Sequence, residues 1–229
     1  MPRVGSFVFR EETTVAESRT EFVFGRVRRV VTLAGVLNGF SSRSAYEAAI
    51  AEVRRELERF DRGETDFSLT AGRFIEGRRR RFDLVRNDAG CFAAVHLEIL
   101  AADRYERSES ESAEVVAIAA SPQTVPLEPD GNWPALPRLR LEAVGTIVNP
   151  SFSDGTRTLS AALTLAPGDV LELDGENRTA SKNGSENVLH LISGEFPEVH
   201  PAGTDLEYAD ETPGGPDATL TVAWRDLWV

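Results

Sequence analysis

The chain contains little cysteine and no long apolar run. One cysteine among 229 residues, Cys91, excludes an internal disulfide framework, and its place at the start of an apolar run favours a buried small side chain. No apolar run approaches the length of a membrane span, so we expect no membrane insertion. Residues 1–6 lack the apolar core of a secretory signal. We therefore expect synthesis in a cytoplasm, or delivery by a route that needs no signal.

Basic residues are fewer than acidic ones, and almost all of them are arginine. The formal net charge is −12, and Lys182 is the only lysine. Binding to nucleic acid is dominated by Lys and Arg that neutralise phosphates, so this balance argues against general affinity for nucleic acid. The length of the chain suits one large domain or two small ones, each with its own core.

Recognisable catalytic and metal-binding motifs are absent from the sequence. His96, His190 and His200 are far apart and have no Cys or His at metal-ligand spacing; we expect the first two in strands and the third in a loop. Asp169 and Asp174 could form a carboxylate pair for glycoside hydrolysis. Their turn-like setting instead favours aspartates that bond their own backbone. We therefore expect no enzyme activity, no metal and no cofactor.

The first half of the chain has the pattern of a sheet. Residues 19–33 mix apolar and polar side chains as an extended segment does, and Gly35 and Gly39 punctuate its end. Further strands are expected at residues 67–69, 73–75, 82–85, 92–100 and 114–120.

One helix is predicted, over residues 44–60. Ser44 and Glu47 fit a capping box at its start, and Gly63 lies where a helix stop is expected. Apolar residues recur at helical spacing at Tyr46, Ala49, Ile50, Val53, Leu57 and Phe60. Such a stripe packs on a sheet, so the first half is predicted to be a sandwich that carries one helix.

Two polar breaks suggest where the domains end. Residues 106–112 read as a solvated loop, and residues 121–137 hold five of the twelve prolines, as a stiff connector does. We therefore predict a first domain over residues 1–125, a linker over 126–137 and a second domain over 138–229.

The second domain is predicted to be an antiparallel sandwich or jelly roll. After Arg138 every segment is short and strand-like, with turn residues between segments. The predicted turns are Asp154-Gly155, Pro167-Gly168-Asp169, Asp174-Gly175, Asn183-Gly184 and Pro213-Gly214-Gly215-Pro216. Asn183-Gly184 suits a tight primed hairpin, whose two central residues have positive φ.

The one basic cluster is a candidate contact between copies of the chain. Arg78, Arg79, Arg80 and Arg81 could bind phosphate, could blunt a strand edge, or could form salt links to carboxylates of an adjacent copy. The contrast between this local charge and the acidic chain favours the third hypothesis.

Three tryptophans could serve as a sugar-stacking surface, as core, or as interface anchors. Trp224 lies in an apolar segment and is expected in the core, whereas Trp228, near the C-terminus, is a candidate inter-subunit contact. Trp133 follows the Asp130-Gly131 turn signal.

Short motifs follow one another in a characteristic order along nearly the whole chain. In the first half they lie at residues 33–39, 69–73 and 101–105, around the predicted helix. In the second half they lie at residues 131–134, 138–142, 146–150, 167–174, 183–184, 196–197 and 221–224. In this order and spacing the chain resembles the distal tail proteins of long-tailed, non-contractile viruses and related virus-derived particles.

The resemblance implies a mainly β fold and a structural role. It implies an N-terminal β-sandwich with one amphipathic helix that closes into a ring, usually of six copies, and a C-terminal galectin-like antiparallel β-sandwich outside the ring. The implied partners are other copies of the chain, the tail tube protein, and tail hub and receptor-binding or fibre proteins. The implied location is the virion tail tip. The genome would pass through the lumen without specific binding, and the acidic charge predicts a neutral or acidic inner wall.

Two other functions remain open on the sequence. The second domain could be a carbohydrate-binding module for host-surface glycans, which would need an exposed aromatic ring beside convergent polar groups on one sheet face. An enzyme that acts on envelope glycans would need the Asp169 and Asp174 pair. The structural ring protein is the first hypothesis.

Overall fold

The computed structural model describes the chain as two compact units. The units comprise residues 1–109 with Val229, and residues 110–228. The described residues are 3–4, 7–9, 14–23, 26–61 and 66–229, with the backbone alone at 22, 23, 26–28, 60 and 61.

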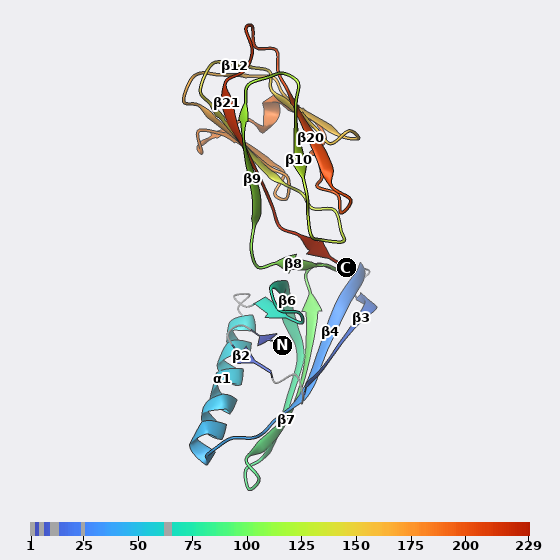
Figure 1. Cartoon of the computed structure of the whole chain (residues 1–229). Coiled ribbons are helices and arrows are strands. Elements are labelled where there is room, and N and C mark those ends of the chain that lie inside the picture. Colours follow the sequence, from blue (N-terminus) through green and yellow to red (C-terminus); the bar gives the residue numbers. More distant parts are fainter. Residues whose placement is uncertain (1–2, 5–6, 10–13, 24–25, 62–65) are drawn as a thin grey trace. The chain divides into compact units, whose positions relative to one another are not determined.

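The first unit is an antiparallel sheet with one helix against it (Figure 1). The strand order is β2-β1-β5-β6-β7-β4-β3, and β8 pairs with the start of β6. The elements are β1 (Arg3–Val4), β2 (Phe7–Val8), β3 (Thr14–Val23), β4 (Arg26–Leu37), α1 (Arg43–Asp61), β5 (Asp66–Ser68), β6 (Arg73–Asn87), β7 (Phe92–Ala101) and β8 (Glu106–Ser108). The predicted mainly β fold with one helix is confirmed, and the strands of this unit, predicted as a sandwich, lie in one sheet.

The helix packs its apolar stripe on the sheet as predicted, but its first turn is capped differently. Tyr46, Ile50, Val53 and Leu57 are all buried in one core with the inward side chains of β4 and β7. The amide of Ala45 donates to the hydroxyl of Ser42. Ser42 is therefore the N-cap, and the predicted capping box is wrong.

Glu47 takes no part in the cap, because its carboxylate receives a hydrogen bond from Arg86 of β6 (2.6 Å). The side chain of Phe60 and the predicted stop at Gly63 lie outside the described residues.

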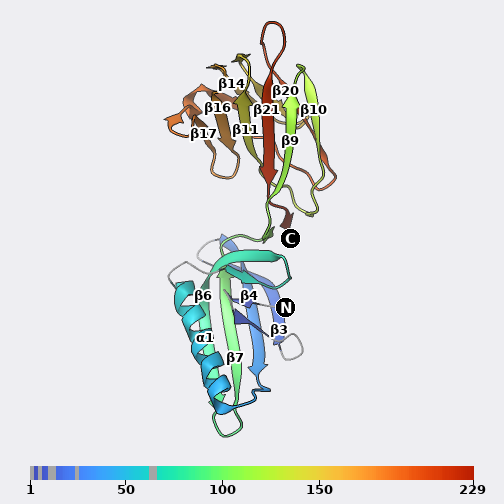
Figure 2. The same cartoon turned by 60° about the vertical axis from the view of Figure 1, so that its left-hand side comes forward.

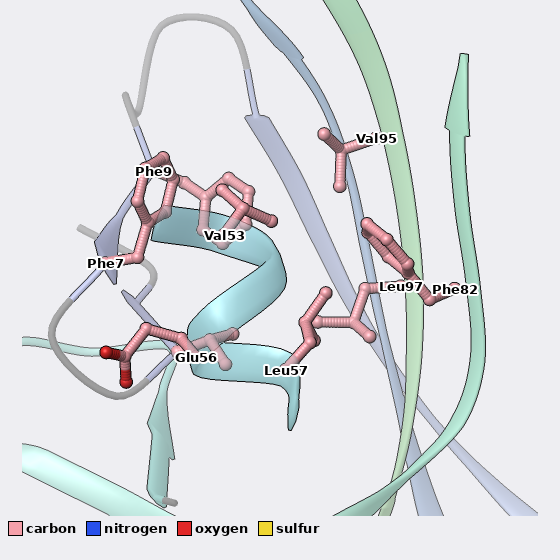
Figure 3. Close-up of a pocket in the computed structure, with 9 residues that line it drawn as sticks. Phe7, Phe9, Val53, Glu56, Leu57, Phe82, Val95 and Leu97 are labelled. Carbon is pink, nitrogen blue, oxygen red and sulfur yellow. The ribbon is translucent and has the colours of Figure 1, made fainter. Parts of the chain in front are cut away.

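The space between the helix and the sheet is filled by side chains (Figure 3). Phe7 and Phe9 cover one side of the helix, with ring centroids 5.0 Å apart in an edge-to-face contact. Val53 and Leu57 of α1 meet Phe82 of β6, and the gap that they leave has no room for a water molecule. This region is packed core and not a ligand pocket.

The second unit consists of two antiparallel sheets that face each other (Figure 2). One has the order β10-β20-β13-β14-β19, the other β18-β17-β16-β11-β21-β9, and β12 pairs with β15. The strands are β9 (Ser112–Ile118), β10 (Gln123–Leu127), β11 (Arg138–Ala143), β12 (Ile147–Val148), β13 (Ser151–Ser153), β14 (Thr158–Ala161), β15 (Thr164–Leu165), β16 (Val170–Asp174), β17 (Thr179–Lys182), β18 (Glu186–Asn187), β19 (Ile192–Gly194), β20 (Thr204–Ala209), β21 (Ala218–Trp224) and β22 (Leu227–Trp228).

Alternation along these strands builds the core of the second unit. Every second residue of β11, β16 and β20 is buried, as expected for strands with one face in a sandwich core. Phe152 and Tyr208 meet there edge to face, with centroids 5.7 Å apart. The predicted antiparallel β-sandwich is confirmed.

The predicted turns join these strands with the backbone angles that their residues favour. Asn183 and Gly184 both have positive φ, 53° and 69°, as a primed turn requires. Gly155, Gly168, Gly214 and Gly215 likewise have positive φ.

The division between the units lies earlier than the sequence predicts. It falls between Glu109 and Ser110, because β9 pairs with β21 and β10 pairs with β20. The expected linker over residues 126–137 therefore belongs to the second unit. Within it Trp133 and Ala135 bridge to the backbones of Leu227 and Val199. Pro126 of the proline-rich segment lies in the edge strand β10, so the segment is not a connector between units.

Three local expectations in the first unit are wrong. Residues 19–33 do not form one extended segment, because β3 and β4 pair as two strands, and Gly35 lies inside β4. Residues 73–75 and 82–85 belong to one continuous strand, β6. Glu106 lies in β8 and is buried beside Arg29, at 3.1 Å, so only residues 109–111 of the predicted solvated loop are exposed outside a strand.

Two single-residue expectations are also corrected. Cys91 is half-buried in the turn before β7, with φ 48°, and not fully buried as expected. His190 lies exposed in the short 3-10 helix Leu189–Leu191 and not in a strand, because the chain turns there between β18 and β19.

Candidate assembly surfaces

The arginine cluster lies in the middle of β6, at a bulge. Arg79 pairs with Ile99 of β7 and Arg81 pairs with Glu98, so Arg80 is the extra residue. Among the described strands, β6 has a partner on its outer side only at Arg73–Glu76, through β8 and β5. From Arg78 to Asn87 the outer edge of β6 is therefore open.

Arg80 and Arg81 of the cluster form ion pairs within the chain. Arg80 contacts the carboxylates of Glu21 on β3 and Glu98 on β7, and Arg81 contacts Asp83 at 2.6 Å. Arg19 completes the cluster with hydrogen bonds to Glu21 and Glu98. Arg19, and after it Arg80, hold the pKa of Glu21 below its usual value through these hydrogen bonds. The cluster therefore ties β3, β7 and β6 together across one face of the sheet.

Sequence reasoning did not identify the acidic half of this cluster. Glu21 and Glu98 are distant in sequence from the arginines and come close only through the strand order β6-β7-β4-β3. The signal in the sequence was the alternation of charge along β3, at Glu17, Arg19 and Glu21.

The opposite edge of the same sheet is β3, which is the last strand in the order. Glu17 of β3 and Arg78 of β6 are both exposed, and in the described part of the chain neither makes an ion pair or a hydrogen bond. Pairing places Glu17 opposite Thr32, and Arg78 opposite Leu100. Both side chains therefore lie on the sheet face away from the helix. The two open edges thus present one free charge of each sign.

The face of the sheet away from the helix carries charges of both signs. Its described charged residues are four arginines and four carboxylates: Arg19, Arg78, Arg80, Arg81, Glu17, Glu21, Asp83 and Glu98. At one end of this face lies an exposed apolar strip, made of Val15, Ala34, Val36, Val85, Phe92 and Ala94.

The tryptophans occupy three different environments in the second unit. Trp224 is buried, as predicted, and its indole nitrogen donates to Asp226 (3.1 Å). Trp133 and Trp228 are half-buried. Their distribution does not form an exposed aromatic platform. The role of Trp228 between subunits stays a prediction.

The outer face of the six-stranded sheet contains a hollow of about 460 Å³. Arg138 in it binds both carboxylate oxygens of Glu111 at 3.0 Å, and Arg140 contacts Glu142 at 2.8 Å. The lining residues are Glu111, Ala113, Arg138, Arg140, Glu172, Asp174, Thr179, Ser181, Thr221 and Ala223. No aromatic ring is among them, so this hollow lacks the feature that the carbohydrate-binding hypothesis requires.

Asp169 and Asp174 are turn residues and do not form a pair. Asp169 precedes β16 and Asp174 is the last residue of that strand, so they are about 16 Å apart at the usual rise per residue. Asp169 accepts from the Ala166 amide, and Asp174 accepts from the Asn177 amide. Asn183, and after it Lys182, lower the pKa of Asp169 to about 2. Glycoside hydrolysis needs two carboxyl groups within about 10 Å, which this separation does not provide.

The described residues hold no group of three or more His, Cys, Asp or Glu that could bind a metal ion. Among them no helix is long and apolar enough to cross a membrane.

Comparison with known proteins gives a match at the level of the fold. No protein-family model matches the chain, and no curated protein matches its sequence. Among solved structures it is similar to the crystal structure of the SPP1 Dit (gp 19.1) protein, a paradigm of the hub adsorption apparatus in phages that infect Gram-positive bacteria. The TM-score is 0.63 and the identity 15%, over 99% of this chain and 92% of that one. Over nearly its full length, this chain has the fold of the SPP1 Dit protein.

Proposed function

We propose that this protein is a structural component of a virus tail tip, of the distal tail type. Copies of its first unit close into a ring, six in number, that joins the tail tube to the host-adsorption apparatus. The fold shared with the SPP1 Dit protein supports the tail-tip role. The observation that carries the ring is the pair of unlike open edges on the sheet of the first unit.

The two edges suit head-to-tail contact between copies. A ring needs two different complementary surfaces on each copy. β3 is ten residues long, and the open part of β6, from Arg78 to Asn87, has the same length. The open stretch of β6 carries five arginines and one aspartate, whereas β3 carries two glutamates and one arginine. Unlike charges on the two edges favour contact between different edges over contact between like ones.

The strand directions also suit closure. The strands β6, β7, β4 and β3 pair antiparallel in succession, so β6 and β3 run in opposite directions. When β3 of one copy meets β6 of the next around an axis, the new pair is antiparallel as well. Backbone hydrogen bonds then continue the sheet from copy to copy. The bulge at Arg80 interrupts this edge, so regular pairing is expected over residues 81–87.

The proposed ring places the helix-free face toward the lumen. Carboxylates lie among the arginines on that face, and the overall charge of the chain is −12, so we expect the lumen to lack general affinity for the genome. The apolar strip at one end of the face is a candidate contact for the tail tube or hub protein. The second unit would then face the receptor-binding or fibre proteins.

A charge-swap experiment tests the ring. Light scattering should give about 150 kDa, six times the 25.1 kDa chain mass, and negative stain should show closed rings. Arg78→Glu or Glu17→Arg should each weaken the ring, because each reduces the charge difference between the two edges. Arg55→Glu on the exposed side of α1 is the matched control. A monomer at all concentrations, or single variants as stable as the control, would overturn the proposed edge contact.

A further inference from the structure

One strand edge in the second unit is open and unprotected. β9 is the last strand of the six-stranded sheet and pairs on one side only, with β21 over seven residues. An exposed edge is a template for another strand, so proteins usually protect it by short length, proline, charge or a bulge. β9 has seven residues, one charge, no proline or glycine, and a regular register with β21.

The other edge strands of the two units carry such protection. β10 contains Pro126, β18 has two residues, and β19 has three residues and ends in Gly194. β6 and β3 of the first unit carry charges, and both are occupied in the proposed ring contact. Among the described edge strands, β9 is therefore the one whose outward backbone amides and carbonyls are neither protected nor used by the proposed ring contact.

The hydrogen-bond ladder identifies the free groups. The amide of Ala143 in β11 donates to Asp169, and its carbonyl accepts from Gly168, so the backbone of Ala143 faces β16. The backbone of the preceding residue, Glu142, therefore faces β21. Alternation across β21 then directs the backbones of Glu114 and Val116 toward β21 and those of Ala113 and Val115 outward. Ala113 and Val115 make no other backbone hydrogen bond in the described part of the chain.

The end of this edge is closed by a side chain. The amide nitrogen of Gln123 donates to the outward carbonyl of Ala117 at 2.8 Å, and its oxygen accepts from Ala119. Gln123 thus occupies the place of an added strand at the carboxyl end of β9. Two copies of β9 paired about Val115 would set Ala113 against Ala117, where that carbonyl is already taken. A second copy is therefore a poor occupant, and a shorter segment of another protein fits better.

The side chains along the edge define what that segment carries. Val115 is 64% exposed on the face that bears the hollow, next to Ala113. Glu114 is exposed on the other face, and among the described residues it has no ion pair. An incoming strand would bury an apolar side chain against Val115 and set a basic side chain opposite Glu114. The net charge of −12 also favours a basic partner.

We propose that the open edge of β9 binds an extended polypeptide segment of another protein, with apolar residues alternating with lysine or arginine, by β-strand addition centred on Ala113 and Val115. This site lies in the second unit and uses none of the residues of the proposed ring contact. It therefore offers the assembled particle a place to hold a second component.

Hydrogen exchange of the full-length protein tests the site. The probe is a capped heptapeptide that alternates valine with lysine, and its matched control alternates valine with glutamate. The lysine peptide should slow amide exchange in residues 112–118, and the glutamate peptide should not at the same concentration. Glu114→Lys should reverse this preference.

A proline variant separates edge binding from other binding. Val115→Pro removes an outward amide that the sheet does not use, so the fold and the ring mass should persist while protection by the peptide is lost. No protection with either peptide, or equal protection in Val115→Pro, would overturn the proposal. Protection that grows with protein concentration alone would also overturn it, because the occupant would be a second copy. Loss of the ring with peptide binding intact would count against the proposed function only.

Discussion

Replacing Tyr208 with phenylalanine isolates one buried hydroxyl in the core of the second unit. Tyr208 is fully buried, and its hydroxyl donates to the carboxylate of Asp210 at 3.0 Å. The ring stays in edge-to-face contact with Phe152, so Tyr208→Phe removes the hydrogen bond and little else. A second donor, the hydroxyl of Thr212, stays on the same carboxylate oxygen at 2.7 Å.

The contacts of Asp210 determine how much stability Tyr208→Phe should remove. A hydrogen bond to a charged group contributes about 1.5–3 kcal/mol to stability. The other oxygen of Asp210 is buried with no hydrogen-bond partner, so the carboxylate has little other compensation. We expect Tyr208→Phe to lower the free energy of unfolding of the second unit by about 2 kcal/mol.

The same residue makes stability depend on alkaline pH. Burial, and after it the hydrogen bond and charge of Asp210, raise the pKa of Tyr208. The folded pKa lies above the unfolded value of about 10, so this stabilisation is complete below pH 10. As pH rises further, the unfolded chain ionises first, and stability falls by about 1.4 kcal/mol per pH unit. Tyr208→Phe should abolish this loss.

Fluorescence makes the assay specific to the second unit. All three tryptophans lie in that unit, and Tyr208 is its only tyrosine. Urea unfolding followed by tryptophan emission, at neutral pH and above pH 10, therefore reports the intended change. Tyr46→Phe, which removes a buried hydroxyl in the first unit, is the control. Equal pH dependence in the wild type and Tyr208→Phe would refute the reasoning.

Two further predictions concern a turn and a strand end of the second unit. Asp169→Asn should remove a stabilisation that is present above about pH 4 and lost as pH falls toward 2, because the folded pKa lies below its usual 3.8; acid unfolding monitored by tryptophan emission measures this. Gly194→Ala should destabilise by at least about 3 kcal/mol, since a Cβ there would overlap the Thr158 carbonyl oxygen at φ +94°. Gly155→Ala, at φ +84° with open space around it, should cost only about 1–2 kcal/mol in the same urea assay.

The sequence predicted elements whose signals are local. The helix was found because its apolar stripe has a period that needs no tertiary knowledge, and the turns of the second unit were found from Gly, Asn and Asp. The sequence predicts an N-cap at Ser44, two residues after the observed cap Ser42, because a serine caps a helix equally well at either position in isolation. In the structure the Ser42 hydroxyl accepts from the helix, and Glu47 bonds to Arg86.

Features that depend on distant partners were misjudged. The proline-rich segment resembled a linker, yet Pro126 is tolerated in β10 because an edge strand has backbone amides to spare. Glu106 looked solvated because its neighbours are Ser and Glu, and only Arg29 on β4 explains its burial. The sequence identifies the arginine cluster, but the ion pairs of Arg80 with Glu21 and Glu98 depend on the strand order, which the sequence does not show.

The number of strands between the two open edges of the first unit has an evolutionary consequence. From β6 to β3 the count is even, so the edges run in opposite directions. If one strand were gained or lost, the two edge strands would run in the same direction. Every contact between copies in a closed ring would then have to change from antiparallel to parallel pairing. Gain or loss of a whole hairpin preserves this parity. Under the proposed closure, variation in sheet size among proteins of this fold is therefore expected in steps of two strands.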